Sequence, residues 1–337
     1  MKNRWFWILS AGILLGALAC SKDQAPPAPI VNVNIPSNPT PVPTWNPALG
    51  RDWYSATANA GWSGRIQHTV LAFNNKLWVL GGYDSTNFYG DAWSSSNGVS
   101  WSNTGAVTFT RRAGHSSVVF NNKMWVIGGQ DNVGYKGDTW SSSNGVSWTQ
   151  SASGPATFPG REGHSTVVYN GKIWVIGGFN SSGVTGDVWS SSDGVSWSLA
   201  TAQANFGPRS NQTSLVFNNQ MWVIGGQTIG ADGGVWSSND GVNWTQVTGA
   251  AEFGPRYYHQ SVVYNGVMWV IGGQDGGGNP KNDAWYSMDG NIWTQATASG
   301  GFSAREGLAG AVLNNHLWAM GGIGNSLPCK NDVWYSP

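Results

Sequence analysis

The apolar and polar residues of this 337-residue chain follow one pattern that recurs six times. One copy, HSTVVYNGKIWVIGG at residues 164–178, places two apolar-rich runs on either side of Asn-Gly. Asn and Gly tolerate the positive φ angles of a two-residue turn, so each copy predicts an antiparallel hairpin. A further stretch such as DTWSSS at residues 138–143 predicts a third strand, and a second Asn-Gly or Asp-Gly turn leads to a fourth strand that carries a Trp.

The second strand of each copy ends in a Gly-Gly pair, and these pairs measure the period of the repeat. The pairs lie at residues 81–82, 128–129, 177–178, 225–226, 272–273 and 321–322, with spacings of 47 to 49 residues. A period near 50 residues built from short strands is typical of a β-propeller, in which each repeat forms one four-stranded blade. The sequence therefore predicts an all-β propeller of six blades and twenty-four strands.

The last repeat stops at DVWYSP, residues 332–337, and has no fourth strand of its own. The segment LGRDW at residues 49–53 aligns with DGVSW at residues 193–197, which lies at the third-to-fourth strand turn of another copy. We expect an N-terminal strand to complete the last blade and close the ring, which leaves no exposed sheet edge there.

Tryptophan recurs at three positions of every repeat. Large flat rings fill the widening space between blades, so we expect these residues in the core rather than as sugar-stacking platforms. They are Trp78, Trp125, Trp174, Trp222, Trp269 and Trp318 on the second strand, Trp93, Trp140, Trp189, Trp236, Trp285 and Trp334 on the third, and Trp53, Trp101, Trp148, Trp197, Trp244 and Trp293 on the fourth.

The order Arg-x-Gly-His, apolar strand, Gly-Gly, Asp-x-Trp and a distant Trp resembles the Kelch repeat, over residues 50–337. Strand directions place the Arg-x-Gly-His start of the first strand, the Gly-Gly end of the second and the Asp start of the third on one face of the ring. The Asn-Gly turns lie on the other face. The resemblance implies that the first face, with its longer loops, binds ligands.

Two repeated polar positions are expected to be structural. Each arginine should pair with a carboxylate or with backbone carbonyls inside its blade. The arginines are Arg65, Arg112, Arg161, Arg209, Arg256 and Arg305, and the aspartates two residues before the third-strand Trp are Asp91, Asp138, Asp187, Asp283 and Asp332, with Gly234 in blade four. Histidines spread one per blade do not converge on a metal ion; they are His68, His115, His164 and His259, with Gln212 and Leu308 at the same position and His316 at a hairpin.

Residues that differ between blades on the predicted binding face are the candidate ligand contacts. Aromatic rings together with amides suit the recognition of a glycan or a peptide. The candidates are Tyr83, Gln130, Asp131, Glu162, Phe179, Asn211, Gln227, Tyr257, Tyr258, Gln274, Asp275 and Glu306.

Glu162 and Glu306 occupy equivalent positions in blades three and six. Two carboxylates across a pocket could perform acid–base catalysis. Opposite blades are expected to hold them too far apart, and pairing with the neighbouring arginines is the alternative. The sequence therefore predicts no catalytic pair, no metal site and no cofactor.

The start of the chain indicates export. Lys2 and Arg4 precede an apolar stretch, and ALAC resembles a bacterial lipoprotein signal, so residues 1–19 are expected to be removed and Cys20 to carry the lipid. Residues 20–47, rich in proline, are expected to form a tether to a propeller at residues 48–337. This predicts a location at the bacterial outer membrane or cell surface, with the periplasmic face as an alternative and with membrane contact only through the lipid.

Equal numbers of basic and acidic residues, 17 each, argue against a nucleic-acid partner. The leading interpretation is a monomeric, non-enzymatic propeller that binds a glycan or a protein. The alternatives are a sugar-active enzyme similar to the Kelch-like sialic acid mutarotases and a purely structural surface protein. Kelch-like copper oxidases are disfavoured, because no Tyr and His set accompanies Cys329.

Overall fold

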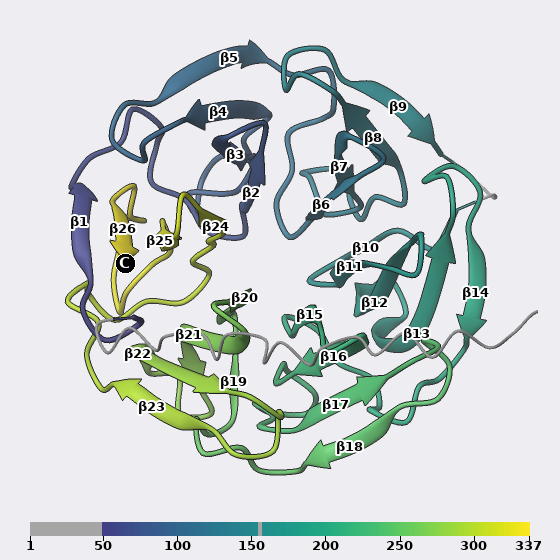
Figure 1. Ribbon diagram of the computed structural model, residues 1–337. Coiled ribbons are helices and arrows are strands. Elements are labelled where there is room, and N and C mark those ends of the chain that lie inside the picture. Colours follow the sequence, from purple (N-terminus) through teal and green to yellow (C-terminus); the bar gives the residue numbers. More distant parts are fainter. Residues whose placement is uncertain (1–48, 154–156) are drawn as a thin grey trace, which may run out of the picture. The chain divides into compact units, whose positions relative to one another are not determined.

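The computed structural model describes residues 49–153 and 157–337, and the expected signal, Cys20 and the whole expected tether lie outside this range. Six antiparallel sheets stand around a common axis (Figure 1). The predicted all-β six-bladed propeller is confirmed. Blade one contains β2 (Thr69–Phe73), β3 (Lys76–Leu80), β4 (Asp91–Ser95) and β5 (Ser102–Ala106). Blade two contains β6 (Ser116–Phe120), β7 (Lys123–Ile127), β8 (Thr139–Ser142) and β9 (Thr149–Ala152). Blade three contains β10 (Arg161–Glu162), β11 (Ser165–Tyr169), β12 (Lys172–Asn180), β13 (Gly183–Ser191) and β14 (Ser198–Thr201).

The other half of the ring repeats this order, with the first strand of each blade nearest the axis and the fourth at the rim (Figure 1). Blade four contains β15 (Thr213–Phe217), β16 (Gln220–Ile224), β17 (Val235–Ser238) and β18 (Thr245–Thr248). Blade five contains β19 (Arg256–Tyr257), β20 (Gln260–Tyr264), β21 (Val267–Asp275), β22 (Pro280–Ser287) and β23 (Thr294–Thr297). Blade six contains β24 (Val312–Leu313), β25 (His316–Met320), β26 (Val333–Ser336) and β1 (Tyr54–Thr57).

Blades three and five carry a short fifth strand, so the expected count of twenty-four strands is too low. In these blades the second strand, β12 or β21, runs on for nine residues, past the Gly-Gly pair. The extension forms a hairpin with the third strand and pairs on its other edge with β10 or β19. The extra strands therefore follow from loops that continue the sheet on the predicted binding face.

Blade six is built from both ends of the described chain. The strand β1 pairs with β26 in an antiparallel register that sets Tyr54 opposite Tyr335. Just before it, the backbone N–H of Gly50 donates to Oγ of Ser336 at 2.7 Å, as Gly98 does to Ser95 at 2.8 Å in blade one. The N-terminal segment thus occupies the place of the missing fourth strand, starting one residue after Trp53.

The tryptophans of the second strand pack between blades, and each ring leaves room only for a glycine at one repeated position of the next blade. The Trp78 ring lies against Gly145 of the next blade, and a Cβ built there would be 2.0 Å from the ring. Gly145 also has φ +75°, a conformation that side chains other than glycine rarely adopt. The same contact joins every neighbouring pair of blades, including Trp269 to Gly50 at the closure. The prediction of core tryptophans is confirmed for this set and for the fourth-strand set, in which all but Trp101 are buried, whereas the rings of the third strand are half-buried.

Candidate functional site

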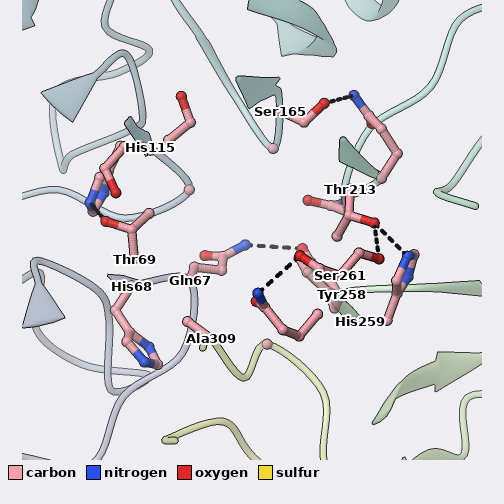
Figure 2. Close-up of a pocket in the computed structure, with 18 of the residues that line it drawn as sticks. Gln67, His68, Thr69, His115, Ser165, Thr213, Tyr258, His259, Ser261 and Ala309 are labelled. Atoms are coloured by element: carbon pink, nitrogen blue, oxygen red, sulfur yellow. Dashed lines mark hydrogen bonds between the residues drawn. The ribbon is translucent and has the colours of Figure 1, made fainter. Parts of the chain in front are cut away.

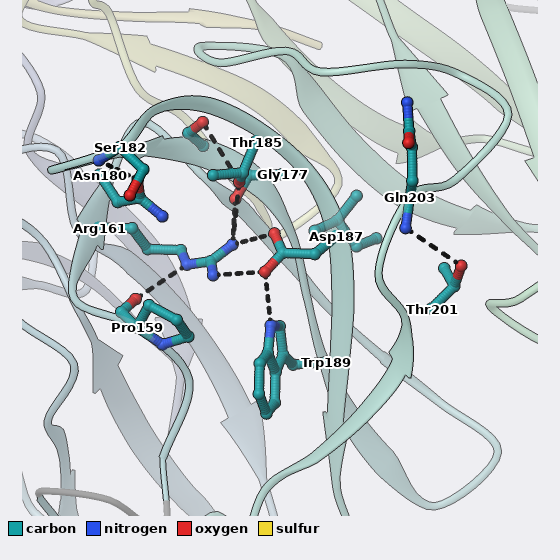
Figure 3. A network of polar contacts seen from close by, with 12 residues as sticks. Pro159, Arg161, Gly177, Asn180, Ser182, Thr185, Asp187, Trp189, Thr201 and Gln203 are labelled. Carbon is teal, nitrogen blue, oxygen red and sulfur yellow. Dashed lines mark hydrogen bonds and ion pairs between the residues drawn. The ribbon is translucent and has the colours of Figure 1, made fainter.

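Five of the six blades contain a buried Arg–Asp–Trp network, shown for blade three in Figure 3. Arg161 donates to both carboxylate oxygens of Asp187, at 2.6 and 2.8 Å, and to the carbonyl of Gly177 at 2.9 Å. Trp189 Nε1 donates to the same carboxylate at 2.7 Å. Burial alone would raise the pKa of Asp187, but the hydrogen bonds and charge of Arg161 outweigh burial and lower it. The network ties the loops of the binding face to the sheet.

All six repeated arginines are held in this way, with side chains no more than 3% exposed. Blade four differs from the others in the partners of its Arg and Trp. Gly234 replaces the usual Asp, so Arg209 reaches Asp232 at 3.5 Å, and Nε1 of Trp236 has no partner among the described residues. Because they are buried and paired, the arginines do not form an anion site on the face of the ring.

A cavity of about 240 Å³ lies on the axis, lined by the first strands and the loops before them (Figure 2). Five blades line it with hydroxyl groups, while blade six contributes Leu308, Ala309 and Gly310. Hydroxyls of neighbouring blades bond to one another, as Ser116 does to Thr166 at 2.5 Å and Thr213 to Ser261 at 2.6 Å. The walls of the cavity therefore satisfy most of their own polar groups.

The repeated histidines are buried in this wall, between neighbouring blades. Burial lowers the pKa of each to about 3, so they are neutral at pH 7. Nε2 of His115, His164 and His259 contacts a hydroxyl of the preceding blade at 3.1, 2.9 and 2.8 Å. His68 follows blade six, which has Ala309 in place of the hydroxyl, and neither of its ring nitrogens has a hydrogen-bond partner among the described residues.

The mouth of the cavity is formed by the residue two positions after each repeated arginine. In every blade this residue has a left-handed backbone, with φ between 53° and 62°. Its N–H donates to the carbonyl of its counterpart in the preceding blade, from Gly114 to Gln67 at 3.0 Å through Gly307 to Tyr258 at 3.0 Å, for five of the six junctions. Glycine suits this conformation and occupies it in blades two, three and six.

Three blades place a larger side chain at this strained position: Gln67, Asn211 and Tyr258. All three line the cavity. Gln67 donates to the hydroxyl of Tyr258 at 3.0 Å, which joins blades one and five at the mouth (Figure 2). Gln67 was not among the candidates from the sequence. Alignment of IQH in blade one with AGH in blade two was the available signal, since it shows Gln in place of a required Gly.

Glu162 and Glu306 stand next to this position, in blades three and six. Burial raises the pKa of both carboxyl groups. The Gln130 amide lies 2.9 and 3.1 Å from the oxygens of Glu162 and donates to them when its nitrogen faces the carboxylate. Burial raises the pKa of Tyr258 to about 12, with a further contribution from the charges of both glutamates. The expected alternative, pairing with the arginines, is not what the described structure has.

The remaining sequence candidates divide into two groups. Four hold their own loops: Asp131 pairs with Lys136 at 2.8 Å, Asp275 with Lys281 at 2.6 Å, Gln274 donates to the carbonyl of Gly278 at 3.1 Å, and Gln227 bridges Ser210 and Ala231 through its backbone. Three present aromatic rings around the mouth: Tyr83 packs on Phe88, Phe179 on Tyr135, and Tyr257 on Tyr258, with centroids 4.8, 5.8 and 5.3 Å apart.

Other chemistry is sparse in the part of the chain that the structure describes. No group of three or more His, Cys, Asp or Glu residues there is arranged to hold a metal ion. Cys329 is buried and free, and burial raises the pKa of its thiol. Within residues 49–153 and 157–337, no helix has the length and apolar character needed to cross a membrane.

Comparison with known families agrees with the geometry. The model of the KLHDC2/KLHL20/DRC7 Kelch-repeats domain matches residues 51–226, which is more than half of the chain. The chain belongs to the Kelch-repeat family. A second model, the Kelch motif, matches residues 255–298 of this Kelch propeller. Compared with curated proteins, the chain has no significant match. Kelch propellers are suited to protein binding, and the mouth described above is where this one gathers the side chains that differ between its blades.

Proposed function

We propose that this Kelch propeller is a non-enzymatic binding protein that recognises a protein ligand at the mouth of its axial cavity. The observation that carries the proposal is the gathering of Gln67, Asn211 and Tyr258, all non-repeated, at a backbone position that favours glycine. Strained residues are kept where the surrounding structure enforces them, and they cluster at functional sites. Tyr257 and Phe179 add apolar rings around this mouth, as protein-binding surfaces commonly do.

A sugar-active enzyme is the weaker candidate. One glutamate and one arginine in the same pocket could suffice for a mutarotase-like site. The lining of the axial cavity includes neither an arginine nor a glutamate, and the six repeated arginines are paired inside their blades. The two glutamates at the mouth therefore support recognition better than catalysis.

The test is an array of peptides and glycans probed with the full chain. We expect peptides to bind, and Tyr257→Ala/Tyr258→Ala to abolish the binding. Lys123→Ala, at the exposed Asn-Asn turn of blade two on the other face, serves as the control and should bind normally. Binding of glycans alone would replace the protein ligand with a sugar, and peptide binding that survives the Tyr variant would place the site elsewhere.

We further propose that the protein is exported and anchored through a lipid on Cys20, with its binding face directed away from the membrane. Support comes from the ALAC motif and from the position of the N-terminal strand, which enters the ring in blade six. A labelled fatty acid should be incorporated into the chain and not into a Cys20→Ala variant. Equal labelling of the two would rule out this anchor.

A further inference from the structure

Two carboxylates beside the mouth of the cavity, Glu306 and Glu162, have few hydrogen-bond donors around them. Oε2 of Glu306 is buried and has no partner among the described residues. Glu162 has the Gln130 amide as its side-chain hydrogen-bond donor in the described structure, and the Tyr258 hydroxyl already accepts a bond from Gln67. An unpaired buried carboxylate oxygen costs free energy, which a donor entering from outside would offset.

Cations of the chain itself do not supply this donor. None of the nine ion pairs between described residues includes Glu162 or Glu306. The repeated arginines point into their blades, and the nearby lysines Lys136 and Lys281 are paired with Asp131 and Asp275. The two carboxylates thus stand at the entrance of a polar cavity without a counter-charge from these residues.

The glycines of the mouth leave room for acceptor side chains of the following blade. A Cβ on Gly114 would lie 2.8 Å from Oε2 of Glu162, and one on Gly163 would lie 2.5 Å from Oδ1 of Asn211. These acceptor oxygens therefore lie against glycines of the preceding blade that line the cavity. A cavity of about 240 Å³ admits one side chain rather than a folded segment.

We propose that the mouth is a pocket for one basic side chain, a lysine or arginine of the bound protein, placed between the carboxylates of Glu306 and Glu162 on opposite sides of the mouth, with Tyr258, Gln67 and Asn211 as neutral polar contacts. This rests on the proposed function and gives its ligand a chemical class. The ammonium or guanidinium group supplies several N–H donors and no acceptor, which is the complement of the groups at the mouth.

The pocket is tested with small probes that need no protein partner. N-acetyl-lysine methylamide and N-acetyl-arginine methylamide are titrated against the full chain by NMR, with the ε-acetylated lysine compound as the uncharged probe. We expect the charged probes to bind and the acetylated probe to bind at least tenfold more weakly. Glu306→Gln and Glu162→Gln should each weaken the charged probes by about tenfold, since a hydrogen bond to a charged group is lost.

Glu252→Gln is the matched control, because Glu252 is the third described glutamate and accepts from the backbone N–H of Trp293 at 2.9 Å, away from the cavity lining. It should leave probe affinity unchanged. Equal affinity for the charged and acetylated probes, or no effect of either mouth variant, would overturn the basic-side-chain pocket.

The two proposals fail in different ways. If arrayed peptides bind equally with Lys or Arg replaced by Gln, the protein-binding function stands and the basic-side-chain pocket is wrong. If the charged probes bind as expected and no arrayed peptide binds, the pocket stands and the protein-ligand proposal is wrong.

Discussion

The interior of the blades and the mouth of the cavity use polar residues in opposite ways. In the interior, Arg161 meets Asp187 through two oxygens, and that carboxylate also accepts from Trp189. At the mouth, Glu306 has a buried oxygen without a partner in the described structure, and Gln67 and Tyr258 adopt backbone angles that favour glycine. The polar side chains of the interior network form hydrogen bonds within their own blade, whereas the mouth has a buried acceptor without a hydrogen-bond partner in the described structure.

This difference separates stability from recognition. A repeated network contributes to the same local structure in five blades, so its side chains need no ligand to be satisfied. Residues that occur once and carry a local cost need another reason to be there, and binding is the reason that the geometry supports. We therefore expect variants in the interior to lower the free energy of unfolding and keep ligand binding, and variants at the mouth to weaken binding and keep the free energy of unfolding.

The largest expected effect is in the interior, for Asp187→Ala. Its removal leaves the Arg161 guanidinium, whose side chain is 0% exposed, without a counter-charge. Breaking one half of a buried ion pair typically costs about 3–5 kcal/mol, so we expect a loss of this size in the free energy of unfolding, measured with urea. Peptide binding by the folded fraction should be retained.

Glu306→Gln is the counterpart at the mouth. It removes a charge that has no partner in the described structure, so its free energy of unfolding should stay within about 0.5 kcal/mol of the parent. A loss for Glu306→Gln as large as that for Asp187→Ala would show that the mouth also stabilises the fold, and would remove the contrast.

For a single residue, an effect intermediate between these two is expected from pH. The four repeated histidines have folded-state pKa values of about 3, below the ordinary 6.5, so the unfolded chain takes up protons first as pH falls. Stability is full above pH 6.5 and declines toward pH 3, with a cost near pH 5 of about 2 kcal/mol for each histidine. Urea midpoints at pH 7.5 and pH 5 measure the decline. The raised pKa values of Glu162 and Glu306 act in the opposite direction, so the mouth does not cause it.

Blade four supplies the control for this prediction. There Gln212 occupies the histidine position and donates to the Ile176 carbonyl at 2.8 Å and to Ser165 at 3.3 Å, without titrating. The His259→Gln variant copies this arrangement, so the stability that it loses between pH 7.5 and pH 5 should be smaller by about the contribution of one histidine. A protein as stable at pH 5 as at pH 7.5 would contradict the neutral buried histidines.

The sequence predicted the ring because the Gly-Gly period and the three tryptophan positions are local signals repeated six times. It did not predict β10 and β19, since those strands form only where a loop happens to continue its hairpin. Asp131 and Asp275 were chosen as candidates because they vary, but variation alone does not distinguish a carboxylate that caps its own loop from one that faces the axis. The Gln67–Tyr258 contact joins residues 191 positions apart and depends on ring closure, which no local pattern records.

The smallest expected effect tests the strain at the mouth directly. Gln67 has φ 53°, and both Gln67→Gly and Gln67→Ala remove its bond to Tyr258. The two variants differ only in a Cβ that the left-handed backbone disfavours, so Gly should be more stable than Ala by about 1 kcal/mol in urea unfolding, even though glycine is the more flexible residue when unfolded. Both should weaken binding of the charged probes, because both remove the same acceptor. If Ala were the more stable of the two, the backbone at residue 67 would carry no strain. Strain would then no longer be a reason to assign Gln67 a role in binding.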